Sequence, residues 1–172
     1  MSNQTIFSQN LSFIQKQLYQ PLNFTISHAT KDKESNEYGA GTYKLNQLTI
    51  ITRTAKITPK KIGQFVAIWQ RDQQGITQPQ HIDDKFDLLV INCANGDKFG
   101  QFVFPKTALA KHGIISTTQK RGKNGIRVYP SWDKAINKQA VKTQNWQLGY
   151  FLEFSLEIDL GRAKQLYSEQ AV

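Results

Sequence analysis

Acidic residues that precede one strand, and a lysine that follows the next strand, are the part of this sequence that could perform chemistry. Asp84 and Asp87 lie just before the apolar run at 88–91, and Glu37 lies at an earlier junction between a loop and a strand. Carboxylate oxygens hold hard cations such as Mg²⁺ and Mn²⁺, and a lysine beside them can contact the phosphate under attack. With Lys106 or Lys98 at an end of the hairpin-paired strand, this spacing is compatible with metal-dependent cleavage of a phosphodiester.

A structural role for the same carboxylates is the alternative. Asp83 and Asp84 are typical of a turn, and Asp87 at the start of a strand can pair with a neighbouring base. The residues alone leave both interpretations open.

The sequence lacks the residue patterns that other classes of catalytic site require. His28, His81 and His112 are scattered, and Cys93 is the single cysteine of the chain. This composition excludes an intrachain disulfide and a cysteine-rich zinc site, and it offers no pattern for a catalytic triad. The sequence also contains no glycine-rich phosphate loop with its lysine and no Gly-x-Ser-x-Gly motif.

The charge of the chain is strongly positive and uneven. Of 172 residues, 22 are Lys or Arg and 13 are Asp or Glu, a formal net charge of +9. Residues 44–71 hold six bases and no acid, and residues 98–146 hold ten bases and one acid. Such a surface attracts polyanions, among which nucleic acid is the commonest inside cells. A merely solvated basic surface is the alternative.

The basic residues of these segments are therefore candidates for phosphate contacts, and two glutamines are candidates for reading base edges. The run from Arg127 through Tyr129 to Trp132 alternates base and aromatic, which suits a backbone contact beside a stacking ring. The predicted nucleic-acid contacts are Lys56, Lys60, Lys61, Gln64, Gln101, Lys106, Lys120, Arg121, Lys123, Arg127, Lys138 and Lys142.

A six-residue segment occurs twice in nearly the same form. Residues 61–66 read Lys-Ile-Gly-Gln-Phe-Val and residues 98–103 read Lys-Phe-Gly-Gln-Phe-Val, with five of six positions alike and a spacing of 37. Aromatic and β-branched residues predict strands, and the leading glycine permits a bend or the close approach of another group. We predict two strands of one sheet that enter it in the same way.

The remaining periodicity places helices around the strands. Apolar residues between Phe7 and Leu18 recur at helical spacing, and Asn95-Gly96-Asp97 predicts a hairpin between the strand at 86–92 and the second repeated segment. Further strands are expected at 42–45, 48–57 and 127–130, helices at 107–111, 138–148 and 159–167, and either helix or strand at 150–154. The predicted fold class is α/β, with one domain spanning residues 1–172 and a mixed, largely antiparallel sheet of about five to seven strands flanked by helices.

Several blocks taken together resemble the MepB family of small bacterial proteins. They occupy 37–40, 53–66, 100–106, 125–132 and 138–146, in this order along most of residues 35–150. The resemblance implies a three-layer α/β fold that is grouped with restriction-endonuclease-like domains.

Nucleases of that fold carry an acidic residue on one strand. On the next strand they carry a second acidic residue, Asp or Glu, and a Lys two positions after it. Asp87 can stand for the first acid, but no acid lies two positions before Lys106, and Gln101 would add an amide oxygen without charge. The nuclease hypothesis uses Glu37, Asp87 and Lys106 as catalytic residues, Glu37, Asp84, Asp87 and Gln101 as metal ligands, and Mg²⁺ or Mn²⁺ as the cofactor.

The sequence thus favours a cytoplasmic protein that binds nucleic acid, double-stranded DNA in preference, on an endonuclease-like scaffold with an incomplete metal site. The alternatives are an active metal-dependent nuclease and a protein-interaction module whose basic face meets an acidic partner. The first twenty residues lack a basic start followed by an apolar block, and no apolar run approaches about 18 residues, so neither a signal peptide nor a membrane span is expected.

Overall fold

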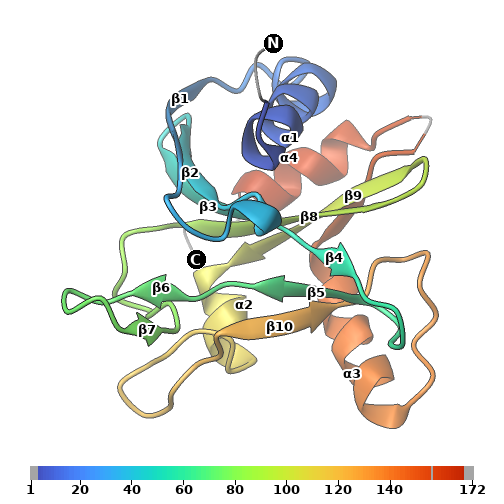
Figure 1. Ribbon diagram of the computed structural model, residues 1–172. Helices are drawn as coiled ribbons and strands as arrows, with labels where there is room; N and C mark the ends of the chain where they lie inside the picture. Colours follow the sequence, from blue (N-terminus) through green and yellow to red (C-terminus); the bar gives the residue numbers. More distant parts are fainter. Residues whose placement is uncertain (1–3, 156, 169–172) are drawn as a thin grey trace.

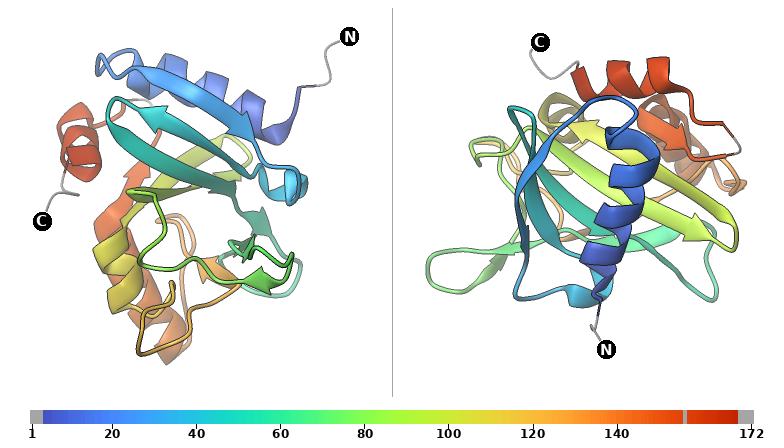
Figure 2. Two further views of the ribbon diagram at one scale, coloured as in Figure 1. Left: turned by 90° about the vertical axis from the view of Figure 1, so that its left-hand side faces the viewer. Right: turned by 90° about the horizontal axis from the view of Figure 1, so that it is seen from above.

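The computed structural model describes residues 4–155 and 157–168, which form three stacked layers (Figure 1). Helix α1 (Ile6–Ile14), its π-helical continuation η1 (Gln15–Tyr19) and helix α4 (Leu160–Ser168) cover one face of a large sheet. A smaller sheet and helices α2 (Lys106–Lys111) and α3 (Lys138–Gln147) lie on its other side (Figure 2). None of the described helices has the length and apolar character needed to cross a membrane.

The large sheet has six strands in the order β1-β2-β3-β8-β9-β11. Neighbouring strands are antiparallel except β3 and β8, which run parallel. The mixed, largely antiparallel sheet flanked by helices is therefore confirmed. The strands are β1 (Ile26–Lys31), β2 (Gly41–Leu45), β3 (Leu48–Thr54), β8 (Leu88–Asn95), β9 (Lys98–Pro105) and β11 (Phe151–Glu153).

Local sequence accounts for the first helix. Thr5 caps α1 because its side chain accepts a hydrogen bond from the backbone N–H of Ser8, and the Ser8 hydroxyl accepts one from the backbone N–H of Thr5. Phe7, Ile14 and Leu18 lie on one face and are buried against the large sheet. The helix predicted from apolar spacing is confirmed.

The hairpin of β8 and β9 separates two hydrophobic cores. Asn95 pairs with Lys98 across a tight turn in which Gly96 has φ +62°, as the Asn-Gly-Asp sequence predicts. Side chains alternate along β8, so Leu88 and Val90 pack under α1 and α4, whereas Leu89 faces the smaller sheet. Both faces of these central strands are buried.

The third layer carries short strands as well as helices. Strand β5 (Gln64–Ala67) lies between β10 (Gly125–Val128) and β4 (Lys56–Ile57), and all three run antiparallel. The hairpin of β6 (Gln70–Arg71) and β7 (Thr77–Gln78) continues from β5. The remaining elements are the short helices η2 (Asn36–Tyr38) and η3 (Leu148–Tyr150).

The two copies of the repeated segment lie in different sheets, so the prediction that they share one sheet is wrong. The first copy forms β5 of the smaller sheet, and the second forms β9 of the large one. Their glycines nevertheless have the predicted use. A Cβ on Gly63 would lie 2.7 Å from the ring of Tyr129, and a Cβ on Gly100 would lie 2.4 Å from the ring of Phe151. Each glycine lets an aromatic ring lie against a strand.

Candidate nucleic-acid interface

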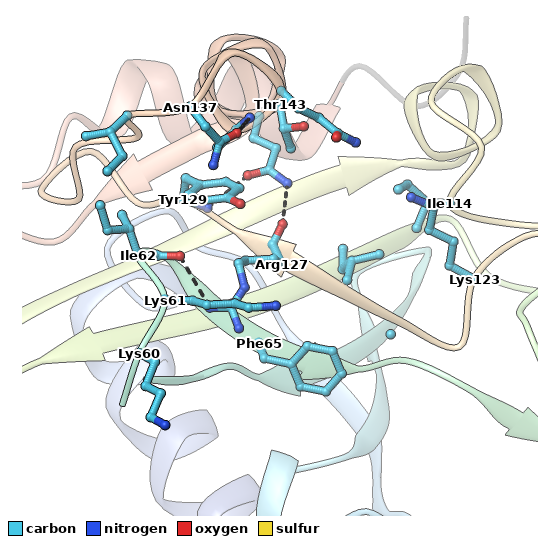
Figure 3. A pocket seen from close by; sticks show the side chains of 16 residues that line it. Lys60, Lys61, Ile62, Phe65, Ile114, Lys123, Arg127, Tyr129, Asn137 and Thr143 are labelled. Carbon is cyan, nitrogen blue, oxygen red and sulfur yellow. Dashed lines mark hydrogen bonds between the residues drawn. The ribbon is translucent and has the colours of Figure 1, made fainter. Parts of the chain in front are cut away.

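A groove of about 650 Å³ is lined by residues of β5, β10 and α3. These elements lie on the side of the large sheet away from α1 and α4 (Figure 1). The walls of the groove come from the connection between β4 and β5, from the outer face of β5 and β10, and from one side of α3 (Figure 3). Segments that are far apart in the sequence therefore meet here, from residue 60 to residue 147.

Among the described residues, four cationic side chains and no acidic ones line the groove. They are Lys60, Lys61, Lys123 and Arg127. Across residues 4–155 and 157–168, the ion pairs involve other bases, so these four charges stay uncompensated. A concave wall with charges of one sign concentrates the field and attracts anions.

Backbone carbonyls hold Arg127 in place. One terminal nitrogen of its guanidinium donates to the carbonyl of Gly63 at 3.1 Å and to that of Ile62 at 3.3 Å. These contacts tie β10 to the connection that carries Lys60 and Lys61. Because a carbonyl carries no net charge, the guanidinium keeps its positive charge and its remaining N–H donors for an anion.

A row of side chains crosses the outer face of the smaller sheet. Arg127 is paired with Phe65, and Phe65 is paired with Lys56, so the three side chains share one face. The Lys56 ammonium lies 4.8 Å from the centre of the Tyr38 ring, which meets the Phe65 ring edge-on at 6.2 Å. Aromatic rings thus lie between bases along this face.

Two glutamines of α3 fix the helix against β10. The amide of Gln147 donates to the carbonyl of Arg127 at 3.0 Å and accepts from the backbone N–H of Tyr129 at 2.9 Å. Gln144 donates to the carbonyls of Tyr129, Pro130 and Asp133. The spacing between helix and strand, and so the width of the groove, is set by these hydrogen bonds.

The other predicted bases lie outside the lining. Lys120 and Arg121 are exposed in the loop before β10, and Lys138 and Lys142 are exposed on α3. Lys106 is half-buried: its ammonium donates to the backbone carbonyl of Asp84 and lies 4.9 Å from the centre of the Phe86 ring.

The role predicted for Gln64 and Gln101 is wrong, because both side chains are buried. The Gln64 amide donates to the carbonyl of Ala94 at 3.1 Å. The Gln101 amide donates to the side chain of Asn92 at 3.1 Å and accepts from the hydroxyl of Tyr167 at 2.9 Å. Neither can read a base edge, and Gln101 is already engaged at the oxygen that would hold a metal. The apolar residues around each glutamine were the signal for burial.

The predicted metal ligands do not gather into a cation site within residues 4–155 and 157–168 either. Asp87 accepts from the backbone N–H of Thr49 at 2.7 Å, and Asp84 accepts from that of His81 at 2.7 Å. Glu37 is exposed in η2. Within the described part of the chain, no three Asp, Glu, His or Cys residues lie close enough to hold a metal ion. Asp84 and Asp87 instead satisfy backbone donors.

Sequence reasoning missed the apolar and uncharged polar lining of the groove. Three large apolar residues line the groove: Ile62, which is 39% exposed to solvent, Ile136, which is 76% exposed, and Phe65, which is 36% exposed. Asn137 and Thr143 line it from α3. The signal that could have drawn attention to Ile136 is a large apolar residue in a short segment, 133–139, that is otherwise polar except for Ala135.

Comparisons with known proteins agree with the family resemblance. The MepB-like family model matches residues 32–153. A crystal structure of MepB is 32% identical, covers 90% of this chain and 100% of its own, and superposes with a TM-score of 0.75. A bacterial homing endonuclease is 13% identical over 81% of this chain and 83% of its own, with a TM-score of 0.42. No curated protein sequence matches the chain.

Proposed function

The chain belongs to the MepB-like family, and from this premise and the charge of the groove we propose that it is a cytoplasmic DNA-binding protein that holds the phosphate backbone of double-stranded DNA. The groove between β5, β10 and α3 is the binding surface. Lys60, Lys61, Lys123 and Arg127 are the phosphate contacts.

One observation carries this proposal: within the part of the chain that the structure describes, the groove is lined by four basic side chains and by no acidic one. A protein-interaction surface would need an acidic partner of matching shape, whereas a nucleic-acid backbone offers regularly spaced charges to any basic wall. Exposed Lys56, Lys138 and Lys142 lie on the elements that form the groove and extend its positive charge.

The salt dependence of binding tests the proposal. Each phosphate that a base neutralises releases condensed cations, so four contacts give a slope of log affinity against log salt of about −3.6. The triple variant Lys60→Ala/Lys61→Ala/Lys123→Ala is expected to bring the slope to about −0.9. Fluorescence anisotropy with a labelled duplex measures both.

A matched control removes charge from the opposite side of the molecule. Lys16 and Lys164 are exposed on η1 and α4, across the large sheet from the groove. Lys16→Ala/Lys164→Ala is expected to leave the slope within about 0.5 of the wild-type value. Equal slopes for wild type and the triple variant, or a slope near zero for wild type, would overturn the proposal.

A further inference from the structure

The groove contains more than a phosphate backbone needs. A continuous duplex presents phosphates and sugars to a basic wall, while its bases stay stacked inside. The groove, however, has the volume of a small-molecule site, about 650 Å³, and includes an aromatic ring and groups able to form hydrogen bonds. These features call for a ligand with a flat apolar face and a polar edge.

Three large apolar side chains of the lining are partly exposed. Phe65, Ile62 and Ile136 come from β5, the connection before β5 and the segment before α3, and are 36% to 76% exposed. Large apolar side chains gathered in one concave, otherwise charged site mark a binding surface. Phe65 projects into the groove beside Arg127 (Figure 3).

The backbone beside Phe65 is shaped to admit its ring. A Cβ on Gly125 would lie 2.6 Å from the Phe65 ring, so the glycine leaves the space that the ring occupies. On the outer edge of the ring, Arg127 and Lys56 stand on either side in the cross-strand row. An aromatic ring between two basic side chains can stack a nucleobase while the basic side chains hold its flanking phosphates.

The opposite wall offers polar groups without partners. The side chains of Gln139 and Thr143 line the groove from one side of α3 and form no hydrogen bond within the described residues. The oxygen of the Asn137 side chain accepts from the backbone N–H of Ala140 at 2.8 Å, and its NH₂ group has no hydrogen-bond partner among residues 4–155 and 157–168. Such amides and hydroxyls can pair with the Watson–Crick edge of an unstacked base.

We propose that the groove receives an unpaired nucleotide of DNA. Its nucleobase stacks against Phe65 and turns its hydrogen-bonding edge toward Asn137, Gln139 and Thr143. Its flanking phosphates lie against the surrounding lysine and arginine side chains. This inference rests on the proposed function and specifies the form of DNA that the groove selects. The nucleotide can be extruded from a duplex or belong to a single strand, since both present the same face, edge and phosphates.

Three labelled probes of one sequence test this inference: a fully paired duplex, the same duplex with one bulged nucleotide, and the single strand. Binding to the bulged duplex or the single strand is expected to be about tenfold or more tighter than to the paired duplex, the scale of one base stacked on a ring. Tighter binding to the bulged duplex alone would show that the ligand is a nucleotide extruded from a duplex. Tighter binding to the single strand would show that the ligand is an extended single strand.

Variants of Phe65 then test the site itself. Phe65→Ala is expected to reduce the preference ratio to about 1, and Phe65→Tyr to retain it, because only the first removes the ring. A thermal melt checks that both variants are folded. Equal affinity of wild type for all three probes, or an unchanged ratio in a folded Phe65→Ala, would overturn the inference and leave the proposed function standing. Absence of salt-dependent binding to every probe would instead overturn both.

Discussion

Arg127 of β10 lies directly opposite Phe65 of β5, and a guanidinium and an aromatic ring therefore stand side by side on the floor of the groove. The guanidinium is anchored by the carbonyls of Ile62 and Gly63, 65 and 64 positions earlier in the chain. This pairing joins the strand that carries the ring to the connection that carries two lysines. It makes the groove one unit instead of a set of separate basic loops.

The anchoring role of Arg127 can be separated from its charge. Arg127→Gln and Lys123→Gln each remove one lining cation, so each is expected to reduce the salt slope by about 0.9. Arg127→Gln also releases the connection with Lys60 and Lys61, so its affinity for DNA is expected to fall further than that of Lys123→Gln. Anisotropy titrations over about 50 to 200 mM salt measure both quantities. Identical affinities of the two variants would show that the anchor has no effect.

Alanine substitutions at two glycines with nearly the same positive φ can separate the energetic cost of backbone strain from that of a steric clash of the added Cβ. Gly63 and Gly75 have φ +83° and +81°. A Cβ on Gly63 would meet the Tyr129 ring and the carbonyl of Val128, whereas a Cβ on Gly75 would meet no described atom within 4 Å. Gly75→Ala is expected to lower the free energy of unfolding by about 1 kcal/mol, and Gly63→Ala by about 2 to 4 kcal/mol. Denaturant unfolding measures the difference, and equal losses would refute a tight ring contact.

The buried tyrosines predict how stability changes in alkali. Tyr19 forms hydrogen bonds with the hydroxyls of Tyr43 at 2.6 Å and Tyr167 at 2.8 Å, and burial raises the pKa of all three well above its usual value. Above pH about 10 the unfolded chain loses these protons while the folded protein retains them, so the free energy of unfolding should fall as the pH rises. Below that pH the three groups contribute no pH dependence.

Tyr43→Phe tests this assignment, since it removes one of the three titrating groups. Its slope of unfolding free energy against pH, between about pH 10 and 11, is expected to be shallower than that of wild type by about 1.4 kcal/mol per pH unit at most. Denaturant unfolding at several pH values measures the slopes. Parallel slopes for the two proteins would place the alkaline transition elsewhere.

Gln101 is expected to act on stability and not on binding. Gln101→Leu removes the donor to the Asn92 side-chain oxygen and the acceptor of the Tyr167 hydroxyl, both buried, which should lower the free energy of unfolding by about 1 to 3 kcal/mol. Gln139→Leu, at an exposed position, is the control and should change stability by less than about 0.5 kcal/mol. A Gln101→Leu protein of wild-type stability would contradict the hydrogen-bonded network.

The carboxylate of Asp87 is expected to have no catalytic role. It accepts from the backbone N–H of Thr49, and the backbone N–H of Asp87 donates to the carbonyl of Thr49, so it serves the contact between β3 and β8. Plasmid incubated with Mg²⁺ or Mn²⁺ should show the same background nicking with wild type and Asp87→Asn, whose amide oxygen can still accept. Cleavage by wild type that is lost in Asp87→Asn would restore the nuclease hypothesis.

Local patterns in the sequence determined much of the secondary structure. The Thr5–Ser8 cap, the apolar spacing up to Leu18 and the turn at Gly96 each act between residues close in the chain, and the structure contains all three. The excess of bases in 44–71 and 98–146 also follows from the sequence alone. Such features need no knowledge of packing, because their partners are near neighbours.

Only the tertiary structure decided which of these residues act together. Gln64 and Phe65 are adjacent in sequence, yet one is buried under Ala94 and the other lies in the groove, because β5 packs one face on the large sheet. Four of the predicted bases converge, while Asp84 and Asp87 are engaged by backbone donors. The physical reason is that a side chain's environment depends on segments tens of residues away, whose approach is set by burial of the sheet faces and leaves no local signal in the chain.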